Sequence, residues 1–178
     1  MALIPVYHVV PSFYPVDPDH NAVTSPIYMG HFVTLNSSGY VAKATHTNAI
    51  GIAGDTIASD AGYTPYAADI VISSAGHTRS TSNRISDYFD ETRGSGKMTV
   101  YHSGGEFWTD QYELLDYVPG DKAYCSTTGK LTTSTVSDST IQVGRIISGP
   151  QDYPSGVPGT DVSGSMALGS YVRFKLSL

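Results

Sequence analysis

A glycine-punctuated run of alternating residues between Val118 and Gly149 constrains the fold of this chain more than any other feature. Four successive residues in it alternate outward and inward character: Lys122, Ala123, Tyr124 and Cys125. This period of two is typical of a half-buried strand. Gly129 follows two threonines, and it predicts a tight turn because glycine adopts a positive φ without steric cost. Residues 130–133 then return the chain as a second strand.

A third strand is expected after the polar loop of residues 134–139. Its pattern has two alternating sets, one of which is Ile141, Val143 and Arg145, and the other Gln142, Gly144 and Ile146. We expect each set to lie on its own face of the strand. The stretch is therefore interpreted as strand, turn, strand, loop and strand.

The same pattern occurs earlier, between Gly30 and Gly54. Gly30 and Gly39 precede Gly120 and Gly129 by the same offset of 90 residues, and the glycine of the third strand follows at an offset of 93. This correspondence predicts an internal duplication. Because few identities accompany the glycines, a shared folding rule without common origin remains the alternative. In either case we expect Gly39 and Gly129 at positive φ.

The composition favours an all-β fold. The chain has 178 residues, of which only 15% are charged, and eighteen Gly and ten Pro are scattered along it. Long helices do not tolerate this distribution. We predict a small β-barrel or sandwich with an extended N-terminal arm and long loops rich in Gly and Pro.

The predicted domain organisation has two parts. Residues 1–26 contain five prolines and are interpreted as an arm that docks onto a neighbouring molecule, with a strand near Pro5 at a sheet edge. Residues 27–178 form a single β domain, in which residues 59–117 are interpreted as an insertion. Within that insertion, residues 97–102 and 106–112 are expected to pair as a hairpin. Residues 149–164 are expected to be a long loop, and residues 169–178 a strand.

Charge and cysteine count exclude several classes of function. The net charge is −6 and the ten Lys and Arg are dispersed along the sequence, so no nucleic-acid partner is expected. A lone Cys125 cannot form an intramolecular disulfide or a cysteine zinc site, and is expected to be a small buried residue. No segment has the length of a membrane span or the pattern of a signal peptide. We expect no catalytic residues, no metal site and no cofactor, and therefore no enzyme.

The aromatic residues are the candidate contact residues. Thirteen Tyr, five Phe and one Trp are many for one small core, and Tyr and Trp are enriched at protein interfaces. Five of them are selected as contacts within an oligomer or with a partner: Tyr7, Tyr14, Trp108, Tyr112 and Tyr153. We expect a homo-oligomer, with a trimer as the first choice.

A family resemblance adds to this interpretation. The glycine-bounded strands of residues 30–54, the run Pro119-Gly120-Asp121-Lys122-Ala123-Tyr124, the Val143-Gly144-Arg145-Ile146 segment and the C-terminal strand resemble the capsid decoration, or cement, proteins of tailed bacteriophages. The resemblance covers residues 26–58 and 118–178. It implies a small β-barrel without catalysis that binds the major capsid protein lattice on the outer surface of the phage head. The expected location is the virion, assembled in the host cytoplasm.

Two alternatives remain open at this stage. The first is another virion part, namely a tail-tube, tail-fibre or head-fibre protein. The second is a carbohydrate-binding β module or a glycosidase, which would present an exposed aromatic platform that includes Trp108.

Overall fold

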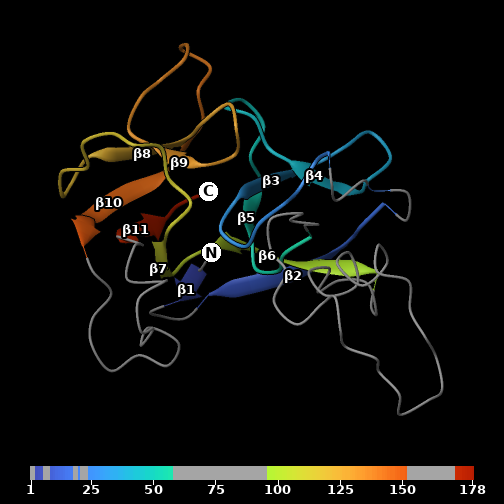
Figure 1. Ribbon diagram of the computed structural model, residues 1–178. Helices are drawn as coiled ribbons and strands as arrows, with labels where there is room; N and C mark the ends of the chain where they lie inside the picture. Colours follow the sequence, from blue (N-terminus) through green and yellow to red (C-terminus); the bar gives the residue numbers. More distant parts are fainter. Residues whose placement is uncertain (1–2, 6–8, 18–19, 21–23, 58–95, 152–170) are drawn as a thin grey trace, which may run out of the picture.

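The computed structural model describes residues 3–5, 9–17, 20, 24–57, 96–151 and 171–178. They contain two antiparallel sheets, seen at the left and the right of Figure 1. The strands are β1 (Leu3–Pro5), β2 (Val10–Pro15), β3 (Phe32–Leu35), β4 (Val41–Lys43), β5 (Gly51–Ala53), β6 (Lys97–Ser103), β7 (Glu106–Thr109), β8 (Lys122–Cys125), β9 (Leu131–Thr132), β10 (Gln142–Gln151) and β11 (Tyr171–Leu176). The all-β prediction is confirmed, and the architecture is a sandwich, with no closed barrel among these strands.

The two sheets repeat one topology. Sheet A has six strands in the order β1-β7-β11-β10-β8-β9, and sheet B has five in the order β2-β6-β5-β3-β4. If β1 is set aside, each sheet is built from five consecutive strands placed in the order first, fifth, fourth, second, third. We call residues 10–103 repeat 1 and residues 106–176 repeat 2. The correspondence therefore extends beyond the glycine pattern to the order of five strands in each sheet.

Strand register supports this correspondence residue by residue. Phe32 pairs with Ile52 in sheet B, and Lys122, at the 90-residue offset, pairs with Arg145 in sheet A. The turn glycines also match, since Gly39 has φ 82° and Gly129 has φ 77°. The prediction of positive φ at both glycines is confirmed.

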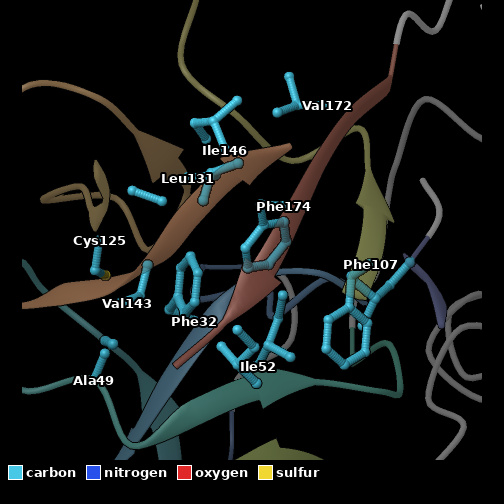
Figure 2. Packing of buried hydrophobic residues seen from close by; sticks show 14 of the residues in the cluster. Phe32, Ala49, Ile52, Phe107, Cys125, Leu131, Val143, Ile146, Val172 and Phe174 are labelled. Carbon is cyan, nitrogen blue, oxygen red and sulfur yellow. The ribbon is translucent and has the colours of Figure 1, made fainter. Parts of the chain in front are cut away.

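The main core lies between the sheets. Phe32 of sheet B meets Phe174 of sheet A edge to face, with ring centroids 6.2 Å apart, and Phe107 lies 5.9 Å from Phe174 on the other side. Figure 2 shows these rings converging with Ile52. Cys125 lies in the same cluster, fully buried and unpaired as expected. Burying each such large side chain contributes on the order of 2 kcal/mol, so this cluster holds the two repeats together.

A second core covers the opposite face of sheet B. It contains Val33, Val41, Ala53, Met98 and Val100. The flanking residues Ile27 and Ile57 pair through an isolated bridge and are buried in the same cluster. The strand β5 and the first half of β3 in sheet B are thus buried on both faces.

Some sequence expectations were wrong. β6 and β7 do not form a hairpin: β6 pairs with β2 and β5 in sheet B, whereas β7 pairs with β1 and β11 in sheet A. The chain crosses between the sheets at Gly104 and Gly105, whose φ angles are 69° and 83°. Two consecutive residues at positive φ also occur in hairpin turns, so the crossing is decided by the long-range pairing of β6 and β7 with different sheets.

The alternation predicted for the third strand of repeat 2 was also wrong. Val143 is buried and Arg145 is exposed, although the pattern placed them on one face. The register against β8 shifts between Gln142 and Gly144, which is a β-bulge. A bulge adds one residue and reverses the alternation beyond it.

The N-terminal arm, the C-terminal strand and the long loop expected from the sequence can be compared with the structure in turn. Strand β1 is an edge strand that contains Pro5, as expected, and Leu3 is buried in the main core. The arm contains two extended strands, β1 and β2, which pair with β7 and β6 within the chain. The C-terminal strand is β11. The first three residues of the expected loop, 149–151, belong to β10, and residues 152–164 lie outside the described residues, as do residues 59–95 of the expected insertion.

Candidate functional site

The hairpin turns of the two repeats have opposite environments. The turn at Gly129 in repeat 2 is packed against repeat 1: the Phe32 amide donates to the Gly129 carbonyl at 2.7 Å, and an added Cβ would lie 3.2 Å from the Phe32 carbonyl. The matching turn of repeat 1 carries exposed residues 36–38, and an added Cβ at Gly39 would meet nothing within 4 Å. Repeat 2 therefore uses its turn to hold repeat 1, and repeat 1 leaves the same turn in solvent.

His31 lies beside this junction and is 3% exposed. Its Nδ1 accepts a hydrogen bond from the Tyr28 amide at 3.3 Å, and its buried Nε2 has no partner. Burial, reinforced by Lys43 and Lys130, lowers the pKa of His31 to about 4. The ring is therefore neutral at pH 7, and protonation would oppose the hydrogen bond at Nδ1.

An open groove of about 520 Å³ lies on repeat 2. Its apolar lining comes from Leu114, Leu115 and Val136, which are 92%, 45% and 59% exposed. The rest of the lining consists of Glu113 and hydroxyl residues of the β8–β9 turn and β9, with one serine after it: Ser126, Thr127, Thr128, Thr132 and Ser134. Exposed apolar side chains gathered at one groove are typical of an interaction site.

The loop that presents Leu114 and Leu115 is anchored at both ends. The Tyr117 hydroxyl donates to the carbonyls of Glu113, at 2.8 Å, and Leu131, at 3.0 Å. Burial and the neighbouring Glu113 raise the pKa of Tyr117, so this hydroxyl remains a donor. The Glu113 amide also donates to the Leu131 carbonyl. The two leucines are thus held in solvent by a fixed backbone.

Most polar groups on the polar side of the groove form hydrogen bonds with one another. Glu113 accepts a 2.6 Å hydrogen bond from the Thr128 hydroxyl, and Thr128 also contacts the Ser126 hydroxyl. The Ser126 hydroxyl accepts from the amides of Thr128 and Lys130, which closes the turn. These hydrogen bonds hold the turn and the polar wall of the groove in one arrangement.

The aromatic residues chosen from the sequence have mixed positions. Trp108 is only 6% exposed, and the Arg173 guanidinium lies 5.7 Å from its ring centroid, so it offers no platform to solvent. Tyr112 is half-buried and meets the Tyr117 ring edge to face at 5.4 Å, next to the groove. Tyr14 packs against the second core from β2. Tyr7 and Tyr153 lie outside the described residues.

Sequence reasoning missed Leu114 and Leu115. A signal was present, because two adjacent leucines between Glu113 and Asp116 lie in a segment without strand alternation. The enrichment of Tyr and Trp at interfaces favoured Trp108 instead. Its position opposite Arg173 cannot be inferred without the sheet register.

In the described part of the chain, no three His, Cys, Asp or Glu side chains gather as a metal site. Nor do these residues include a helix that could cross a bilayer. No family model, no curated protein and no solved structure matches this chain.

Proposed function

We propose that this chain is a non-enzymatic structural protein of a phage virion, a decoration protein that binds the major capsid protein lattice on the outer surface of the head. The observation that carries the proposal is the groove of repeat 2 with Leu114 held 92% exposed by an anchored loop. A fixed apolar projection loses little conformational entropy on docking, so it suits a permanent contact. The resemblance of the glycine-bounded strands to cement proteins supports the same role.

The mechanism is thermodynamic. A protein that binds the assembled lattice but not its free subunits stabilises the lattice by mass action. Many weak contacts on a repeating surface act together, so no single strong site is needed. A homo-oligomer, with a trimer as the first choice, would multiply the grooves that face the lattice.

Co-sedimentation with purified phage heads tests the proposal. The wild-type chain is expected in the pellet, and the L114S/L115S variant is expected to bind at least tenfold more weakly. The matched control is V10S/F13S, which removes two apolar residues of repeat 1 that are 50% and 65% exposed. The control is expected to pellet like the wild type.

The outcomes separate the open alternatives. A wild-type chain that never pellets with heads contradicts the decoration role, and pelleting with tails alone supports the tail or fibre role. Turnover of a glycoside that one Asp or Glu substitution abolishes would establish an enzyme instead. Screens on ester, glycoside and peptide substrates are expected to give background rates.

A further inference from the structure

A row of basic side chains crosses sheet A on the face turned away from sheet B. Arg145 of β10 is directly opposite Lys122 of β8 on one side and Lys175 of β11 on the other. All three are exposed, whereas the residues that precede and follow Lys175 are buried in the main core. We call Lys122, Arg145 and Lys175 the cation row.

Among the residues that the structure describes, no carboxylate forms an ion pair with the cation row. Glu106 is directly opposite Lys175, but its Oε2 accepts from Nε of Arg173 at 2.9 Å and from the second guanidinium nitrogen of the same residue. Arg145 donates to the Gly120 carbonyl at 3.0 Å. Like charges directly opposite on neighbouring strands destabilise a sheet. A chain with only ten Lys and Arg and a net charge of −6 nevertheless places three of them in one register.

The corresponding residues of repeat 1 lie in an interface. Strand register matches the cation row with Phe32, Ile52 and Tyr101. Phe32 and Ile52 are fully buried in the main core, and Tyr101 packs against it with its ring 5.5 Å from Phe107. This face of the repeat therefore receives another layer in sheet B. In sheet A the same face carries charge in place of apolar residues.

We propose that the outer face of sheet A docks an acidic protein surface, with carboxylates meeting the cation row. Directly opposite residues of neighbouring strands lie about 5 Å apart, which matches the spacing of carboxylates one turn apart on a helix or on adjacent strands. Tyr124, half-buried on the same face of β8, adds amphipathic contact area beside the row. The proposal deepens the proposed function and rests on it, because it assigns the acidic surface to the head lattice.

A nucleic acid fits this face less well. The row is only three cations long, whereas a protein that follows a phosphate backbone needs a larger clustered basic face. Trp108, which pairs with Arg173 of β11, is too buried to stack on a base. The chemistry of the face thus favours a short set of carboxylates over a continuous phosphate backbone.

The test measures binding of full-length chains to poly-L-glutamate at low and moderate salt, by fluorescence anisotropy. The K122Q/R145Q/K175Q variant removes the row, and K43Q/K97Q/K130Q has the same net charge but leaves the row intact. The wild type and the charge-matched control are expected to bind equally, with affinity that falls as salt rises. The row variant is expected to bind at least tenfold more weakly while keeping the wild-type circular dichroism spectrum.

Three results would overturn the proposal. The first is equal loss of binding in the row variant and its charge-matched control. The second is tighter binding to duplex DNA than to poly-L-glutamate. The third is self-association of the row variant in light scattering with unchanged poly-L-glutamate binding, which would make the row a device against stacking of copies.

Co-sedimentation with heads separates this proposal from the proposed function. Wild-type pelleting with equal pelleting of the row variant contradicts the cation row and leaves the decoration role intact. Absence of wild-type pelleting contradicts the decoration role, and with it the assignment of the acidic surface to the head lattice. Loss of pelleting in the row variant alone supports both.

Discussion

The two repeats share a backbone plan and differ in what one face of the sheet meets. In repeat 1 the row Phe32, Ile52 and Tyr101 faces the other sheet, and in repeat 2 the equivalent row is charged and exposed. The turns differ as well: Gly129 is buried at the junction, whereas the tip of the Gly39 turn is exposed. A common topology therefore fixes the strands, and side-chain chemistry decides which repeat is covered.

The comparison also explains how the stack of sheets ends. Each repeat has one apolar face: that of sheet A packs on the row Phe32, Ile52 and Tyr101 of sheet B, and that of sheet B forms the second core. If the equivalent row of sheet A were apolar as well, a further layer could add to sheet A. Stacked repeats need a polar outer face on the terminal unit, and Lys122, Arg145 and Lys175 supply it.

Exchanging charged and apolar side chains between the two rows gives the largest expected effect on stability. Ile52→Arg places an unpaired charge in the main core, where Ile52 is fully buried. We expect a loss of about 4 kcal/mol or more in the free energy of unfolding, enough to unfold much of the chain. The reciprocal change Arg145→Ile is expected to shift stability by less than about 1 kcal/mol. Urea unfolding followed by circular dichroism measures both, and equal effects would contradict the comparison.

The turn glycines give the next effect. Both Gly39→Ala and Gly129→Ala force a side chain to positive φ, which costs about 1–2 kcal/mol. Gly129→Ala also brings Cβ within 3.2 Å of the Phe32 carbonyl and 3.3 Å of the Ala44 carbonyl. We expect it to cost about 3 kcal/mol in total. Thermal unfolding of the two variants should therefore differ, and matching midpoints would place Gly129 outside the junction.

His31 makes the junction sensitive to acid. Its pKa is about 4 when folded and 6.5 in the reference state, so the unfolded chain binds more protons between these values. Stability should therefore fall as pH decreases from 6.5 to 4, by about 2 kcal/mol between pH 7.5 and 5 from this group alone. His31→Gln should remove that part of the pH dependence, whereas His102→Gln in β6 serves as the control. An unchanged slope for His31→Gln would contradict the buried neutral ring, with Lys43, Lys130 and Asp110 the charged groups around it.

The smallest expected effect is a small gain in the free energy of unfolding. Lys175→Gln removes one of two like-charge neighbours of Arg145, and we expect a stabilisation of about 0.5 kcal/mol at low salt. Added salt should reduce the difference because it screens exposed charges. Chemical denaturation at two salt concentrations measures it. A destabilised variant would mean that Lys175 has a favourable partner that offsets the repulsion.

Local patterns in the sequence predicted the parts of the fold that depend on neighbours in the chain. The turns at Gly39 and Gly129 follow from glycine, and the alternation around Lys122 and within β11 matches the burial of these strands. These features need only the period of a strand and the steric freedom of glycine.

Features set by long-range pairing were not predictable in this way. The crossing at Gly104 and Gly105 looks like a hairpin in sequence, and the bulge at Val143 appears only against β8. The cation row was missed for the same reason, since it joins residues 122, 145 and 175 through register alone. The offset of 90 residues fails for β6 and β11 because the segments before them, residues 58–95 and 152–170, differ in length.

The central claim is that repeat 2, and not repeat 1, faces the partner. Amine labelling with mass-spectrometric readout, on the free chain and on the chain bound to purified heads, tests it most directly. Lys122 and Lys175 of repeat 2 are predicted to lose most of their reactivity on binding, while Lys97, exposed on β6 of repeat 1, keeps its own. Protection of Lys97 with unchanged labelling of Lys122 and Lys175 would contradict the account.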